Sequence, residues 1–308
     1  MKRFVPIVAV LMLTACHSLR PSATPPAPSI AAAPADALYD NHEQVWQAGT
    51  AAGALAPPRL RLAISSYKGG WQLWRVEADA GTPALWLMQT VPGADGSLRV
   101  LPHRPRVASP TLEPRPDPAE WTALDACALT GAAGGATWRV AADAAACATI
   151  APGIGAAAAF LPIAAARSAE GVDLRLYADQ ARGADASSQA RRVAWYGGWA
   201  AVNGAGPDAS ADSRDWHMNR QLRLSNEGGR SALVWRDGTP SGWSLLLERL
   251  TFREGNTPVL KLSIVEDADG RALAYAFADP HSARIGINLG WIQVGLEREA
   301  ATAEASGR

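Results

Sequence analysis

The N-terminal half of the chain contains many short runs in which apolar and polar residues alternate, with turn residues between them. Residues 59–65, 71–78, 84–91 and 96–101 are runs of this kind. Alternation with a period of two turns one side of a segment towards a core and the other towards solvent. Short alternating runs bounded by Gly, Pro and Asp are typical of antiparallel strands. The sequence therefore predicts an all-β, antiparallel fold.

The middle of the chain is harder to divide. A helix is predicted over 35–49 with Asp36 as its N-cap, and the five prolines between 105 and 118 predict a loop. Residues 120–127 are expected to form one or two helical turns. Short strands are predicted at 136–140, 146–150, 158–163, 172–178 and 191–196. The limits of these strands stay open, because residues 131–166 are rich in Ala and Gly.

The C-terminal third is a clearer series of strands behind a polar stretch at 204–214. Strands are predicted at 220–224, 232–235, 243–252, 258–265, 271–277 and 284–296. They indicate an additional antiparallel β meander over 207–298, followed by a frayed polar tail at 299–308. The boundary is placed after residue 206. Whether the two β regions form two domains or one continuous sheet stays open.

The N-terminus has the three parts of a secretory signal. Lys2 and Arg3 precede an apolar run from Phe4 to Leu13, which is shorter than the roughly 20 residues that span a bilayer. Small residues then precede Cys16, and Leu13-Thr14-Ala15-Cys16 resembles the lipobox of bacterial lipoproteins. The resemblance implies a signal peptide over 1–15, a lipid on Cys16 that attaches the chain to the membrane, and location on the outer membrane facing the periplasm. The Pro- and Ala-rich segment 16–36 is expected to be a tether.

Charge and composition exclude some partners. The chain has 29 basic and 29 acidic residues, and loss of Lys2 and Arg3 with the signal peptide would leave 27 basic residues. This balance does not favour nucleic acid, whose binding depends on neutralising many phosphates.

The cysteines favour a disulfide. Of the three in the chain, Cys16 is assigned to the lipid, which leaves Cys127 and Cys147. In an exported protein such a pair is expected to be oxidised. A metal site is disfavoured because the histidines are scattered and no C-x-x-C is present, so no metal ligand is assigned. A free catalytic cysteine is the remaining alternative.

Tryptophan is unusually frequent, with 12 residues against 4 Phe and 5 Tyr. Indole rings fill large volumes but need a partner for their N–H when they are buried. A protein of this kind uses them as core or as the lining of a ligand pocket, and the core is the more frequent use. Both interpretations stay open for every tryptophan.

Several segments between about 37 and 203 match, in order, the motifs of one known protein family. Tyr39, Asn41 and Gln44 match the opening motif, and Leu85 to Gln89 matches a strand that ends in Glu-Gln-Ala in the family, with Met88 in place of Glu. Further matches are Asp95 to Leu101, the spaced pair Cys127 and Cys147 with Trp138 between them, Leu161 to Leu176 and the aromatic strand 191–199. In this order the segments resemble the CpcT/CpeT family of phycobiliprotein chromophore lyases. The resemblance implies a lipocalin-like antiparallel β-barrel, a calyx, over 37–206.

The family holds an open-chain tetrapyrrole and delivers it to a cysteine of an acceptor protein. The resemblance therefore implies a bilin or another small apolar ligand, and no other cofactor is assigned. Polar anchors for such a ligand would be Gln89 or Arg99. The candidate aromatic ligand-binding residues are Trp71, Trp74, Trp86, Trp195 and Tyr196.

Three functions follow as hypotheses. The first is an envelope-anchored binding protein, and the second is a chromophore lyase. The third is a structural or assembly lipoprotein, whose protein partner stays unknown. Export argues against the lyase, because its acceptors are cytoplasmic. No G-x-S-x-G, H-E-x-x-H or P-loop pattern occurs, so catalytic residues are not assigned. His103 and His217 are expected to be surface or hydrogen-bonded core residues.

Overall fold

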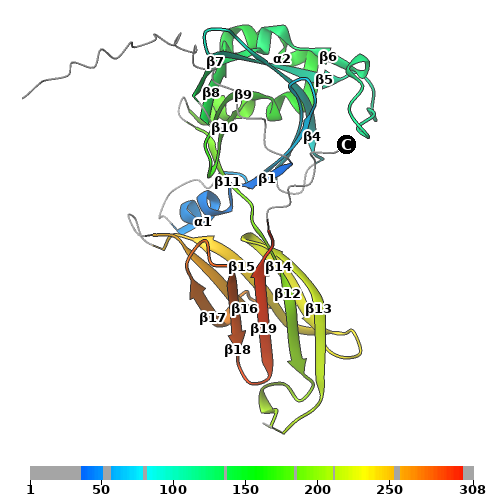
Figure 1. Ribbon diagram of the computed structural model, residues 1–308, viewed down its shortest axis with the longest axis vertical. Helices are drawn as coiled ribbons and strands as arrows, with labels where there is room; N and C mark the ends of the chain where they lie inside the picture. The colour runs from blue at the N-terminus through cyan, green and yellow to red at the C-terminus, as the bar shows by residue number, and fades with distance from the viewer. Residues whose placement is uncertain are drawn as a thin grey trace, which may run out of the picture.

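The computed structural model describes residues 36–50, 57–78, 82–134, 137–183, 186–210, 212–252 and 257–300. The predicted signal peptide, the lipid site at Cys16 and all but the last residue of the tether lie outside these ranges. Figure 1 shows a β-barrel above, a second β region below, and helix α1 (His42–Thr50) between them. No helix in the described ranges has the length and apolarity to cross a membrane.

The upper region is an antiparallel barrel closed by ten strands. Their order is β4-β3-β2-β1-β11-β10-β9-β8-β7-β5, and pairing of β5 with β4 closes the ring, while the short β6 (Trp121–Ala123) extends β5. The barrel strands are β1 (Ala37–Asp40), β2 (Leu60–Tyr67), β3 (Trp71–Ala78), β4 (Ala84–Pro92), β5 (Ser97–Pro105), β7 (Leu129–Gly134), β8 (Thr137–Ala142), β9 (Pro162–Arg167), β10 (Gly171–Leu176) and β11 (Ser188–Arg192). The predicted all-β, lipocalin-like barrel is confirmed.

The inward side chains of the barrel pack into a core. Trp74 and Trp86 are each 1% exposed and lie in this core with Tyr39 and Met88. Both indole N–H groups are satisfied, because Trp74 Nε1 donates to Gln72 Oε1 at 3.0 Å and Trp86 Nε1 donates to the carbonyl of Phe160 at 2.9 Å. The two indoles therefore fill the interior.

One end of the barrel is covered by helical segments held by a disulfide. Cys127 and Cys147 are bonded, with their Cα atoms 4.5 Å apart, which confirms the predicted bridge. The strand predicted at 146–150 is wrong, because these residues lie in α2 (Ala144–Ile154), which Asp143 caps through the backbone N–H groups of residues 145 and 146. A run of alanines has high helix propensity, and the Asp143 cap favours a helix over a strand in this segment. Further 3₁₀ turns lie at Pro118–Glu120, Asp125–Cys127, Gly155–Phe160, Tyr177–Arg182 and Gly206–Asp208.

The predicted helix at 35–49 begins later than expected. Residues 37–40 form β1, which pairs with β2 and β11 inside the barrel. Helix α1 therefore starts at His42, whose backbone N–H donates to Asp40 Oδ1 at 2.9 Å. Asp40, and not Asp36, thus accepts a hydrogen bond at the start of the helix.

The lower region is a sandwich of two antiparallel four-stranded sheets, with orders β13-β12-β19-β18 and β14-β15-β16-β17. Its core includes Tyr196, Leu247, Leu262 and Ile292. The predicted single strand at 284–296 is two strands with a turn between them. The sandwich strands are β12 (Trp195–Asn203), β13 (Trp216–Ser225), β14 (Glu227–Val234), β15 (Pro240–Leu250), β16 (Val259–Glu266), β17 (Ala272–Ala278), β18 (Arg284–Asn288) and β19 (Ile292–Arg298).

The two regions meet earlier in the sequence than the predicted boundary after residue 206. The chain leaves the barrel at Val193-Ala194, and the next strand, β12, pairs with β13 and β19 of the sandwich. Gly198 allows β12 to lie close to β19, because a Cβ at this position would lie 2.1 Å from the carbonyl oxygen of Gly295. The polar stretch 204–214 is the connection from β12 to β13 within the sandwich.

Candidate functional site

The aromatic residues predicted to bind a ligand do not meet at one place. Trp74 and Trp86 are in the barrel core. Trp71 lies outside it, in a separate cluster with Leu73 and Trp121, and its ring centroid is 5.2 Å from that of His103.

The polar anchors also lie away from the barrel interior. Gln89 is the cross-strand neighbour of Trp71, and Arg99 is exposed and paired with Asp125 at 3.3 Å. Trp71, Gln89 and Arg99 therefore lie on the outer face of β3, β4 and β5, because the alternate residues of these strands fill the core.

Trp195 and Tyr196 belong to the sandwich. The guanidinium of Arg223 lies 4.1 Å from the ring centroid of Trp195. Tyr196 is buried, and its hydroxyl donates to the carbonyl of Ser282 at 2.9 Å. Burial raises the pKa of Tyr196 above its usual value of 10.0. Both residues are thus packing elements of the second domain.

The residues that match the opening family motif attach α1 to the barrel. Asn41 is buried, and its Oδ1 accepts from the backbone N–H of Leu60 at 2.7 Å. Gln44 donates to the carbonyl of Ser187 at 2.9 Å and accepts from the N–H of Gln189 at 3.0 Å. Tyr39 is a core residue. These three side chains therefore hold the β1–α1 corner in place.

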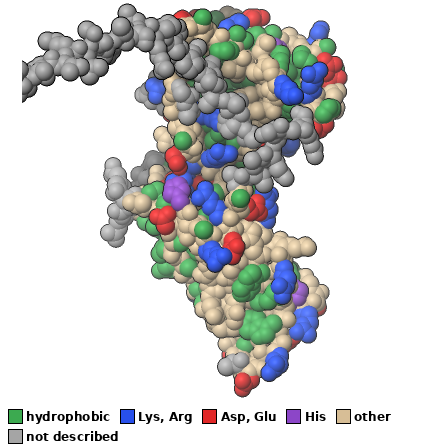
Figure 2. Space-filling model, viewed as in Figure 1, with side chains coloured by type: hydrophobic (Ala, Val, Ile, Leu, Met, Phe, Trp, Pro, Cys, Tyr) green, Lys and Arg blue, Asp and Glu red, His purple; other side chains and the backbone are tan. Residues whose placement is uncertain are grey.

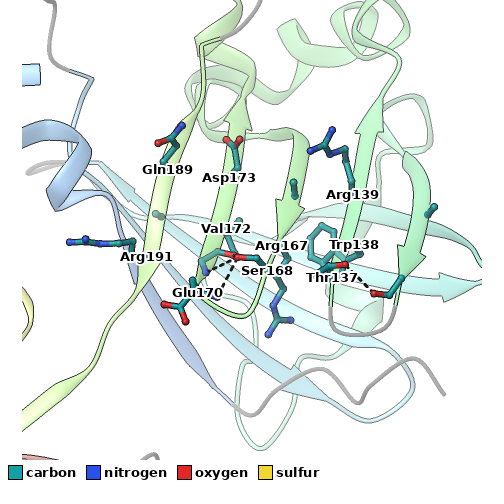
Figure 3. Close-up of a pocket in the computed structure, with 15 residues that line it drawn as sticks. Thr137, Trp138, Arg139, Arg167, Ser168, Glu170, Val172, Asp173, Gln189 and Arg191 are labelled. Carbon is teal, nitrogen blue, oxygen red and sulfur yellow. Dashed lines mark hydrogen bonds between the residues drawn. The ribbon is translucent and has the colours of Figure 1, made fainter. Parts of the chain in front are cut away.

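A groove of about 550 Å³ lies on the outer surface of the barrel, over strands β7 to β11. The strand register aligns Ala132, Arg139, Ala166, Asp173 and Gln189 in one row across these strands. This row is on the outer face, because the alternate residues Val140, Ala165, Val172 and Ala190 belong to the core. Figure 3 shows Arg139, Asp173 and Gln189 projecting from the same side of the strands.

Small residues make the groove hollow. Ala132, Gly134, Ala166 and Gly171 line it between the larger side chains. A Cβ on Gly171 would lie 2.5 Å from the carbonyl oxygen of Ala190, so this position accepts no side chain without a backbone shift. The floor therefore stays at the level of the backbone.

The strand register separates Arg139 from Trp138 and Arg167. Trp138 pairs with Arg167 two positions along from the core pair Val140 and Ala165, so these two side chains belong to the inner face of the strands, whereas Arg139 belongs to the outer face. Trp138 is half-buried, and its ring centroid is 6.4 Å from that of Trp74 in the core. Within the described residues, the side chains of Arg139, Arg167, Asp173 and Gln189 have no hydrogen bond or ion pair. Their polar atoms are thus free to bind a ligand.

Arg191 joins the groove to a charged junction between the two domains. It lines the groove, but its guanidinium pairs with Glu43 of α1 at 3.0 Å and with Glu227 of β14 at 2.9 Å. It also donates to the carbonyl of Arg249. One cation therefore connects barrel, helix and sandwich.

Glu227 is buried in this junction, which changes its acidity. Burial raises its pKa from 4.5 to about 7, an effect that the nearby Arg191 partly offsets. Its Oε1 makes no hydrogen bond in the described part of the chain. The Glu227 carboxyl with this raised pKa therefore titrates near neutral pH.

One histidine–carboxylate contact and two ion pairs of Asp40 complete the junction. His42 Nε2 lies 3.0 Å from Glu248 Oε1. Asp40 accepts from Arg59 at 3.0 Å and from Arg61 at 2.9 Å, and Arg59 also donates to the carbonyl of Glu227. Breaking a buried pair leaves an uncompensated charge, so this junction is expected to fix the angle between the domains.

Sequence reasoning missed the groove because its residues lie in the segment richest in Ala and Gly. The sequence contained one signal of the groove. Positions 132, 139, 166 and 173, which alternate with apolar core positions, are occupied by either alanine or a charged residue. In the described ranges, no three His, Cys, Asp or Glu side chains are grouped to hold a metal ion. The chain matches no protein-family model, no curated protein and no solved structure.

Proposed function

We propose that this protein is a lipid-anchored protein of the cell envelope that binds a small, flat, anionic ligand in the outer groove of its barrel. Linear tetrapyrroles are the first ligand class to test, because of the resemblance to the chromophore lyases. The observation that carries the proposal is the row of Arg139, Asp173 and Gln189 on the outer face, whose side chains have no hydrogen bond or ion pair among the described residues.

The groove suits such a ligand in size and chemistry. Its volume of about 550 Å³ falls in the range of small-molecule sites, roughly 300 to 1,000 Å³. Carboxylates form strong charge-assisted hydrogen bonds with arginine. Asp173 and Gln189 offer oxygens that accept from N–H groups, and Ala132 and Ala166 of the same row leave space for a flat body. A ligand with an acidic arm, ring N–H groups and a flat body uses all of these.

The proposal places the ligand outside the barrel. Trp74, Trp86 and Trp138 pack on the inner side of the barrel, so they support the groove only from behind the strands that form it. The groove is open, and a bound ligand would keep one edge in contact with solvent. This openness favours transfer to an acceptor cysteine as the second candidate function, in which the acceptor supplies the thiol and the groove positions the ligand.

The test is a titration of the full-length chain in mild detergent with biliverdin and with haem. Tryptophan fluorescence and induced visible circular dichroism are followed. We expect saturable binding in the micromolar range, weakened about tenfold or more by Arg139→Gln and by Asp173→Asn, since each removes one charge-assisted hydrogen bond. Arg220→Gln is the matched control, because Arg220 is an exposed arginine on β13 of the sandwich.

Two outcomes would contradict the proposal. Absence of binding to both compounds would exclude the tetrapyrrole class. Binding that is unchanged in both groove variants would place the ligand elsewhere on the protein. Anchoring is tested separately, by metabolic labelling with a fatty acid of the native chain and of Cys16→Ser, and we expect label in the native chain alone.

A further inference from the structure

Strand β17 lies at an open edge of the sandwich and differs from the other edge strands there. Its sequence, Ala-Leu-Ala-Tyr-Ala-Phe-Ala, has no charge. By contrast, β13 carries Arg220 and Arg223, β14 carries Glu227 and Arg230, and β18 begins with Arg284. Natural proteins protect edge strands with charges, because an unprotected edge pairs with another strand.

The outer side of β17 is an exposed apolar surface. Leu273, Tyr275 and Phe277 are 44%, 60% and 52% exposed, and in the described residues β17 pairs with β16 alone. Figure 1 places β17 at the left border of the lower domain, where Figure 2 shows hydrophobic side chains at the surface. Large exposed apolar surfaces of this kind mark interaction sites.

The apolar surface continues from β17 towards the junction. The ring centroid of Phe277 is 5.5 Å from that of Phe252, which is 5.4 Å from that of Trp46 in α1. Phe252 is itself 46% exposed. The patch therefore extends well beyond one strand, and we call Trp46, Phe252, Leu273, Tyr275 and Phe277 the aromatic patch.

The sequence of β17 is nearly symmetric about Tyr275. Leu273 and Phe277 are equally far from it, as are Ala274 and Ala276, and Ala272 and Ala278. If two copies pair antiparallel about a two-fold axis at Tyr275, large side chains face large ones and alanines face alanines. Leu273 is the extra residue of a register shift opposite Ile264/Val265, and its side chain nevertheless stays exposed. Apolar cross-strand pairs of this kind stabilise sheets.

The charges that flank the strand are complementary in the same arrangement. Arg271 precedes β17 and Asp279 follows it, both exposed and both four residues from Tyr275. Antiparallel pairing about Tyr275 brings Arg271 of one copy to the end of the strand where Asp279 of the other copy lies. Opposite charges at both ends favour this register over shifted ones.

From this self-complementarity we infer that two copies of the chain associate through β17, joining their four-stranded sheets into one continuous sheet of eight strands. The interface is isologous, because the same patch contributes from both sides. The aromatic patches of the two copies become continuous, since Phe277 of one copy packs beside Leu273 of the other. The inference does not depend on what the groove binds.

The test uses charge at the two-fold axis. Tyr275→Lys and Tyr275→Glu are made in the full-length chain, and sedimentation velocity in mild detergent measures association. We expect a concentration-dependent dimer for the native chain and about tenfold or more weaker association for each variant, since like charges then face each other. An equimolar mixture of the two variants is expected to dimerise again. Met218→Lys and Met218→Glu, on the exposed edge strand β13, are the matched controls and should dimerise like the native chain.

A second measurement detects weak association. Tyr275→Cys places two thiols opposite each other across the axis, within the distance that a disulfide spans. We expect a covalent dimer under oxidising conditions and none for Met218→Cys. A native chain that stays monomeric and a Tyr275→Cys chain that does not cross-link would overturn the inference. So would a mixture of the Lys and Glu variants that stays monomeric while the native chain dimerises, because another surface would then be responsible.

Discussion

The barrel and the sandwich are both antiparallel and both rich in tryptophan, but they treat their edges differently. The barrel closes through β4 and β5, so none of its ten strands is an edge of the ring. The sandwich leaves edge strands on both sheets, and one of them, β17, has no charge. Closure protects the backbone of the barrel, and its candidate site is therefore a hollow of side chains on a continuous sheet. In the sandwich the backbone itself stays available for pairing.

The largest effect that separates the two regions is expected from the barrel core. Trp86→Ala removes a side chain that is 1% exposed, and it leaves the carbonyl of Phe160 without its donor. We expect the barrel to lose about 3 to 5 kcal/mol of unfolding free energy. Urea unfolding followed by circular dichroism measures the loss. Trp138→Ala, at a half-buried ring that packs against the same core, is the control and should cost less, and an equal cost would contradict the tighter packing of Trp86.

The disulfide is the next test, since it cross-links the barrel alone. The double variant Cys127→Ala/Cys147→Ala opens a loop of 20 residues and is expected to lower barrel stability by about 3 kcal/mol. The sandwich has no cysteine, so its unfolding should be unchanged. Differential scanning calorimetry resolves the two parts. A shift of the sandwich transition by the same amount would show that the domains unfold as one unit.

The junction between the regions predicts a dependence of stability on pH. The folded state holds the proton of Glu227 up to about pH 7, whereas an exposed glutamate releases it near 4.5. Protonation therefore stabilises the fold at low pH, and this contribution, about 3 kcal/mol, is lost as the pH rises from about 4.5 to 7. Glu227→Gln should flatten the stability profile in this window. A profile as steep as that of the native chain would assign the dependence to another group.

The smallest effect is expected at the surface of the sandwich. Glu299 pairs with Arg223 through both carboxylate oxygens, at 2.9 to 3.1 Å, but both side chains are exposed. Glu299→Ala should cost less than about 1 kcal/mol, because solvent screens such pairs. Urea unfolding of the sandwich measures it. A loss as large as that of Trp86→Ala would mean that this pair organises the domain.

The alternation of residues predicted most strands of both regions, because each strand has one side in a core. Alternation failed for segments whose structure depends on a helix cap or on a partner strand that is distant in the sequence. Residues 144–154 form a helix because Asp143 caps a run of small residues, and alanine gives no alternation to detect. Residues 195–203 belong to the sandwich because Gly198 permits close contact with β19, which depends on a partner almost a hundred residues away.

The candidate site was less accessible to sequence reasoning than the fold. Tryptophan marks large buried volumes, but the sequence does not show which rings share a space. Trp71 and Trp86 lie in two different clusters of the barrel, and Trp195 lies against Arg223 in the sandwich. The groove exists because small residues line it. Ala166 leaves room between Arg139 and Asp173, and only the register of β8, β9 and β10 makes these three residues neighbours.

The short connection between the domains also has a mechanical consequence. Strands β1 and β11 are antiparallel neighbours, and the backbone N–H of Val193 donates to the carbonyl of Leu38 at 2.8 Å, where β11 leaves for the sandwich. The start of β1 and the end of β11 thus leave the barrel side by side. If the N-terminus carries the proposed lipid anchor and the sandwich is held by a partner, tension between them would load this hydrogen bond first and then its neighbours one at a time. A pair of strands loaded in this way opens like a zipper at low force, so the barrel would yield before the sandwich is pulled apart.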